Sequence, residues 1–150
     1  MGRYSIEMNR TASATLSVGN IIADATRPRR FKLYDLIFGS AEASPADGNS
    51  LWQVQRCTTA GTATAVTPQA LDPGDAATEM DANENHTTDP TLTANAILLS
   101  IGLNQRATFR WVAAPYGELV GPATASNGLA IRTPTAATVA CTATSHVEEQ

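Results

Sequence analysis

The stretch Thr91–Ala114, TLTANAILLSIGLNQRATFRWVAA, decides the fold class. Large apolar side chains alternate with small or polar ones in its first half, and the alternation resumes after a short polar turn. Because side chains in a strand point alternately to opposite faces of a sheet, the pattern predicts two strands joined as a hairpin. Asn95, Ile97, Leu99, Ile101 and Leu103 share one face of the first strand, and Phe109 and Trp111 share one face of the second.

Shorter stretches of the same kind occur along the rest of the chain, separated by turn-forming residues. They do not alternate with long amphipathic helices, which argues against a doubly wound α/β fold. We therefore expect an all-β chain, a single domain over residues 1–150. The expected architecture is an antiparallel β-sandwich, jelly-roll-like, with about eight strands. Outside the hairpin, the expected strands cover residues 3–8, 31–38, 51–59, 63–70, 128–133 and 138–147.

Two segments lack a clear strand pattern. Residues 9–26 are small and weakly patterned, and we expect an extended N-terminal arm that lies across a neighbouring molecule, with an irregular strand as the alternative. Residues 71–90, LDPGDAATEMDANENHTTDP, hold six of the 14 acidic side chains, and the chain has no Lys or Arg between Arg56 and Arg106. We expect a long, exposed acidic loop there.

The composition limits the class of partner. Of 150 residues, 43% are hydrophobic but only 5% are aromatic, so the core must be thin or be completed by neighbouring subunits. A net charge of −4 argues against a nucleic-acid binder, which normally has a basic excess. Lys32 is the single lysine. The other nine basic residues are arginines. Arginine suits protein interfaces, although the base composition of the genome would give the same excess of arginine over lysine.

Cysteine usage and the first residues indicate a soluble protein made in a reducing compartment. Cys57 and Cys141 are far apart in sequence and fit two buried thiols; a disulfide between them would require neighbouring strands. Residues 1–10, MGRYSIEMNR, carry charges where a signal peptide needs an apolar run. We expect neither a cleaved signal nor a membrane partner.

Metal and cofactor sites are not expected. Asp81, Asn83 and Asn85 have the spacing that begins a helix-loop-helix calcium site, but the sixth and twelfth positions hold His86 and Leu92 instead of Gly and Glu. A looser oxygen site in the acidic loop and a solvated loop are the alternatives, and we favour the solvated loop. The second histidine, His146, has no neighbouring zinc ligand in the sequence.

Catalytic motifs are likewise missing from the sequence. No GxSxG elbow and no phosphate-binding glycine pattern occurs, so we expect no catalytic residues and no enzyme, a small hydrolase being the weakest alternative. A sugar-binding aromatic platform is a further alternative to a core role. It would draw on Trp52, Phe109, Trp111 and Tyr116.

One basic cluster stands out near the end of the expected arm. It would meet an acidic surface on another subunit, or simply be solvated at the start of a strand. We take it, with two apolar residues of the arm, as the candidate subunit or capsid interface. The candidate residues are Ile21, Ile22, Arg27, Arg29, Arg30 and Lys32.

Three parts of the sequence carry a resemblance to small proteins encoded by tailed bacteriophages and prophages. They are RYSIE (3–7), SPADGNSLWQVQRCTTAGTATAVTPQALDP (44–73) and LTANAILLSIGLNQRATFRWVAAPYGELVGPA (92–123), the most specific part being residues 103–115. The resemblance implies a virion structural role and supplies no catalytic residues. The Ala/Thr-rich, weakly charged β pattern is similar to capsid decoration (cement) proteins, which sit on the shell as trimers.

The resemblance implies a decoration protein that binds the outer head surface and stabilises the shell. Its partners would be the major capsid protein and its own copies in a homotrimer, located in the phage head and assembled in the bacterial cytoplasm. A tail or head–tail connector protein is one alternative. A carbohydrate-binding β-sandwich module is another.

Overall fold

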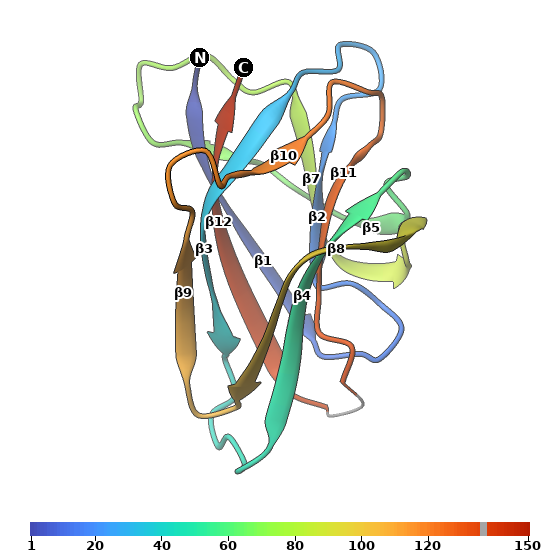
Figure 1. Cartoon of the computed structure of the whole chain (residues 1–150), viewed down its shortest axis with the longest axis vertical. Helices are drawn as coiled ribbons and strands as arrows, with labels where there is room; N and C mark the ends of the chain where they lie inside the picture. The colour runs from blue at the N-terminus through green and yellow to red at the C-terminus, as the bar shows by residue number, and fades with distance from the viewer. Residues whose placement is uncertain (136–137) are drawn as a thin grey trace.

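The computed structural model describes residues 1–135 and 138–150. In these residues the chain is all-β, with twelve strands in two antiparallel sheets and no helix (Figure 1). Within this part of the chain, therefore, no helix is long and apolar enough to cross a membrane. The expected all-β class with two antiparallel sheets is confirmed, whereas the expected number of about eight strands is too low.

The first sheet has the order β10-β3-β12-β1-β6, and β9 pairs with β3 on the same side as β10. β12 pairs along nine residues with β1 on one side and along nine with β3 on the other, and it buries every second residue. The six strands are β1 (Arg3–Thr11), β3 (Phe31–Ser40), β6 (Gln69–Ala70), β9 (Thr108–Val112), β10 (Leu119–Gly121) and β12 (Ala140–Glu149).

The second sheet has the order β5-β7-β2-β11-β4-β8. Its central strands β2 and β11 are almost wholly buried, because loops also cover part of their outer face. The six strands are β2 (Gly19–Ala23), β4 (Asn49–Cys57), β5 (Thr62–Val66), β7 (Met80–Thr88), β8 (Leu92–Asn104) and β11 (Gly128–Arg132).

The core lies between the sheets and follows the alternation of the strands. Inward residues of β1, β3 and β12 meet inward residues of β2, β4 and β11. The largest fully buried side chains are Ile6, Met8, Val18, Ile21, Phe31, Leu33, Leu36, Phe38, Val54, His86, Leu129 and Ile131.

The expected hairpin within Thr91–Ala114 is wrong, although both strands exist. β8 pairs with β4 in the second sheet, and β9 pairs with β3 in the first. The turn between them, closed by a 3.0 Å bond from the Ala107 N–H to the Asn104 carbonyl, therefore crosses from one sheet to the other. A hairpin and a crossing turn have the same alternation in sequence. What separates them is pairing with β4 and β3, which are distant in sequence.

The expected arm over residues 9–26 is also wrong. β1 extends to Thr11, and β2 lies between β7 and β11 with all five residues buried. Ile21 and Ile22 are 0% and 3% exposed, so this chain covers them itself. Small residues made the segment look featureless, but they let β2 pack tightly between its neighbours. Removing residues 1–26 would delete two strands rather than a free arm.

The expected acidic loop over residues 71–90 is half correct. Residues 71–79 connect β6 and β7 outside the sheets, but residues 80–88 form β7, which pairs with both β2 and β5. Met80 and Ala82 face the core, while Asp81 is exposed, so the acidic residue lies on the solvent side of a regular strand.

Candidate functional site

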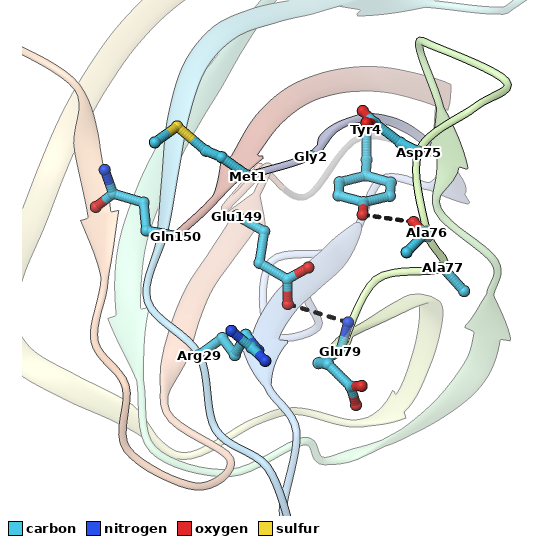
Figure 2. A pocket seen from close by; sticks show the side chains of 10 residues that line it. All are labelled: Met1, Gly2, Tyr4, Arg29, Asp75, Ala76, Ala77, Glu79, Glu149 and Gln150. Carbon is cyan, nitrogen blue, oxygen red and sulfur yellow. Dashed lines mark hydrogen bonds between the residues drawn. The ribbon is translucent and has the colours of Figure 1, made fainter.

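At one end of the sandwich, the two chain termini and two loops surround a pocket of about 250 Å³ (Figure 2). The loops are residues 24–30, between β2 and β3, and residues 71–79, between β6 and β7; Figure 1 shows this end at the top. The pocket is lined by Met1, Gly2, Tyr4, Arg29, Asp75, Ala76, Ala77, Glu79, Glu149 and Gln150. We call this region the charged end.

Two polar side chains of the first sheet fasten the 71–79 loop. The Glu149 carboxylate, only 7% exposed, accepts hydrogen bonds from the Glu79 N–H at 3.0 Å and the Thr78 hydroxyl at 3.2 Å. The Tyr4 hydroxyl donates to the Ala76 carbonyl at 2.7 Å. Burial, together with the nearby Glu149 carboxylate, raises the pKa of Tyr4, so the hydroxyl keeps its proton. The loop is therefore held in place.

The basic cluster meets the acidic loop within the same chain. Arg27 Nη2 lies 3.0 Å from Glu79 Oε2, and the Arg27 side chain is 73% exposed. An ion pair so exposed contributes little stability, but it shows that Arg27 needs no second subunit as partner. Arg29 and Arg30 are exposed on the same loop, and Figure 2 shows Arg29 at the pocket.

Asp24 fixes the start of this loop. Its Oδ1 accepts hydrogen bonds from the Thr26 N–H at 2.8 Å, the Thr26 hydroxyl at 2.7 Å and the Arg27 N–H at 2.6 Å. These bonds, the Thr26 hydroxyl foremost, lower the pKa of Asp24 to about 2. Such a turn sets the direction of the backbone that presents the arginines.

Lys32 lies apart from the three arginines. It belongs to β3 and lines a second pocket, of about 240 Å³, with Arg3, Tyr34, Glu118 and Glu148. Within that pocket Arg3 Nε lies 3.2 Å from Glu148 Oε2, and its guanidinium lies 5.9 Å from the centre of the Tyr34 ring. Of the six expected interface residues, the structure thus brings together Arg27, Arg29 and Arg30. It places Lys32 on a neighbouring surface and buries Ile21 and Ile22.

The outer face of the first sheet carries a buried carboxylate, Asp35, which is 3% exposed. Arg110 binds it through Nε at 2.9 Å and Nη2 at 2.7 Å, and His146 Nδ1 lies 2.9 Å from Asp35 Oδ2. The hydrogen bonds from Arg110, followed by those from His146, hold the pKa of Asp35 below its ordinary value despite burial. Three neighbouring strands, β9, β3 and β12, are linked through this one carboxylate.

Ser5 opposes His146 across the β1–β12 ladder, so Ser5, His146 and Asp35 form a row across three strands. These are the residue types of a nucleophile, a base and an orienting acid. The hydrogen bonds of the described residues include His146–Asp35 but no bond from Ser5 to His146. The backbone around the row is engaged in ladders on both sides. The hydrogen bond observed within the row joins β12 to β3.

The aromatic residues do not form one platform. Trp52 is 3% exposed and lies 4.8 Å from Phe38 between ring centres, inside the core. Trp111 is half-buried against the core, and Phe109 is 38% exposed. Tyr116 is fully exposed on a turn.

The structure shows where the candidate metal ligands and the two cysteines lie. Among the described residues no group of three or more His, Cys, Asp or Glu side chains could hold a metal ion. Asp81, Asn83 and Asn85 belong to β7 rather than to a loop. Cys57 and Cys141 are buried free thiols in opposite sheets. Burial raises the pKa of Cys57 to about 12.

Sequence reasoning missed Asp35 and Glu149. Asp35 did leave a signal, because it is the one acid in an otherwise apolar stretch, and a charge there requires partners. Those partners, Arg110 and His146, lie 75 and 111 residues away, so only the fold identifies them. Glu149 left no comparable signal in its polar surroundings.

Comparison with known proteins gives no assignment for this site. No protein-family model matches the chain, and no curated protein matches it.

Proposed function

We propose that this protein is a bacteriophage decoration protein, which binds the outer surface of the head and stabilises the shell. It acts by docking rather than by catalysis, and its partner is the major capsid protein. The protein is made in the bacterial cytoplasm and assembles onto the particle there. The resemblance of residues 3–7, 44–73 and 92–123 to phage and prophage proteins supports the virion role.

The observation that carries the fold part of this proposal is the strand order. In a jelly roll, eight strands cross between two sheets so that the first pairs with the last and the second with the last but one. Here β1 pairs with β12 and β2 with β11, giving the orders β1-β12-β3-β9 and β2-β11-β4-β8. We interpret the fold as a jelly roll with β5, β6 and β7 inserted and β10 continuing the edge of β9. Viral capsid proteins commonly have this architecture.

The charged end is the proposed head-contact surface. Arg29 and Arg30 are exposed there beside Arg27, on a loop that is fixed by Asp24 and by the Arg27–Glu79 pair. Exposed arginines on an ordered loop suit recognition of carboxylates on a partner, because the guanidinium presents several donors in one plane. Repetition of a modest contact on a symmetric shell then gives a high overall affinity.

Co-sedimentation with purified heads tests this proposal. We expect the wild-type protein to bind, and Arg29→Glu/Arg30→Glu to bind at least about tenfold more weakly, because both charges are reversed. Arg106→Glu is the matched control, since Arg106 lies in the β8–β9 turn at the other end of the sandwich. Wild-type protein that stays in the supernatant would contradict the head-binding role. An equal loss of head binding in both variants would contradict the assignment of the charged end as the contact surface.

A tail or head–tail connector role remains the alternative of the same kind. Connectors occupy a single position on the particle and number about a dozen copies, whereas a decoration protein repeats over the whole shell. The copy number per particle separates the two.

A carbohydrate-binding role is supported by one specific observation, the pocket beside Tyr34. Lectins also use the jelly-roll fold, and a half-buried aromatic ring with polar neighbours suits a sugar ring. The polar side chains around it are Arg3, Lys32, Glu118 and Glu148. Binding in a glycan screen that Tyr34→Ala abolishes would favour this role over the one proposed.

A further inference from the structure

β8 leaves one edge of the second sheet open. Along its thirteen residues it pairs only with β4 among residues 1–135 and 138–150. The backbone N–H and C=O groups on its other side therefore face outward. Such a row is a template for another strand, and long uncharged edges pair readily.

The other sheet edges of this molecule are short or interrupted. β5 has five residues and is followed by Pro68, and β6 has two. β10 has three residues, and β9 has five, among them Arg110. β8 lacks these protections, because the chain has neither a charged residue nor a proline between Thr91 and Gln105. It is thus the edge at which pairing is least opposed.

The second half of β8 is also regular. Leu99–Asn104 pairs without a register shift with Asn49–Val54, whereas the irregularities lie before Leu99, around Asn95 with a φ of 58°. Leu99, Ile101 and Leu103 pack against the core but remain half-exposed. A strand placed alongside would cover the exposed flanks of these three side chains.

We propose that β8 is a contact between two copies of this chain, which pair antiparallel into one continuous sheet across a two-fold axis. A second copy fits because its edge is equally uncharged, so no charge is buried. With the two-fold axis at Ile101, in the regular part of the strand, Ser100 of one copy lies opposite Gly102 of the other. Leu99 of one copy then lies opposite Leu103 of the other, so the same apolar side chains cover each other.

This contact concerns the chain alone and does not rest on the head-binding role. It gives a two-fold dimer in place of the trimer expected from the resemblance. The two assemblies differ in mass, which makes the distinction direct.

Light scattering on the purified full chain tests the contact. We expect wild-type protein with twice the 15.7 kDa mass of the chain. The variant Ser100→Lys/Gly102→Lys should dissociate, with its dimer dissociation constant raised at least about tenfold by like charges facing each other. A Cβ at Gly102 meets no atom within 4 Å, so the substitution fits the folded subunit. Thr64→Lys on β5, the other edge of the same sheet, should remain dimeric.

A charge swap makes the test specific. Ser100→Glu/Gly102→Glu should be monomeric alone and should form a mixed dimer with the lysine variant. Hydrogen exchange of the β8 amides is an independent test that needs no variant. In the wild type, the protection of these amides from exchange should increase with protein concentration. A wild-type monomer or trimer would overturn the proposal. So would a dimer that the lysine pair leaves intact.

Discussion

At Asp35, a carboxylate on the outer face of the first sheet lies under an arginine and a histidine from two other strands. We expect Asp35→Asn to lower the free energy of unfolding by about 1–3 kcal/mol, because the neutral amide loses the charge-assisted hydrogen bonds from Arg110 and His146 and turns a donor towards donors. Asp47→Asn is the matched control: Asp47 pairs with Arg106, but its side chain is 78% exposed. That change should cost less than about 1 kcal/mol. If urea denaturation shows the same decrease in unfolding free energy for both variants, the Asp35 cluster does not stabilise the fold as described.

His86 is a second residue whose environment sets a measurable property. It is 0% exposed, and its Nε2 lies 3.1 Å from the Ala60 carbonyl, so we assign the proton to Nε2. Nδ1 is buried and has no hydrogen-bond partner among the described residues. Burial is the main cause that lowers the pKa of His86 below 6.5.

This lowered pKa predicts a loss of stability in mild acid. Below about pH 6.5 the unfolded chain binds a proton at His86 that the folded chain does not, so stability falls as pH decreases towards the folded pKa. The slope for one proton is at most about 1.4 kcal/mol per pH unit. His86→Gln retains a donor for Ala60 without titrating and should flatten the curve between pH 7 and 5. The Asp35 contribution is lost only as pH falls below 3.8, outside this window. If the unfolding free energy has the same dependence on pH in the wild type and in His86→Gln, His86 is not the group that causes the loss of stability.

Among the elements, β11 approaches β2 most closely at Gly128. A Cβ there would lie 1.9 Å from the Ile21 carbonyl oxygen and 2.7 Å from the Ile22 Cα, which are backbone atoms that cannot rotate away. We expect Gly128→Ala to lower the unfolding free energy by about 1–3 kcal/mol. Gly102→Ala on β8 is the control, because its Cβ meets open space, and should be neutral or stabilising by up to about 1 kcal/mol. Similar thermal midpoints for the two variants would contradict the close packing of β11 on β2.

The sequence predicted some of the strands and missed others. The alternation of Leu99, Ile101 and Leu103 correctly identified a strand with an inward apolar face. It could not reveal that β8 and β9 belong to different sheets, because pairing with β4 and β3 depends on residues far away in sequence. β2 was missed because a strand buried on both faces shows no alternation, and small residues give it a weak pattern.

For the whole molecule, the sequence predicted the class but not the meeting of distant groups. Two antiparallel sheets follow from many short strands and turn residues, as expected. The charged end brings together residues 1–4, 24–30, 71–79 and 149–150, so no local motif could describe it. The sequence identified the arginines of that end and the exposed loop of residues 71–79 separately, but it did not show that they meet there with the two termini.

Quantitative mass spectrometry of purified phage particles tests the proposed role most directly. The measurement is the ratio of this chain to the major capsid protein in intact particles of a phage or prophage whose genome encodes the chain. We predict a fixed ratio with copies over the whole shell, far above the dozen or so of a connector. A chain abundant in infected cells but absent from mature particles would contradict the account.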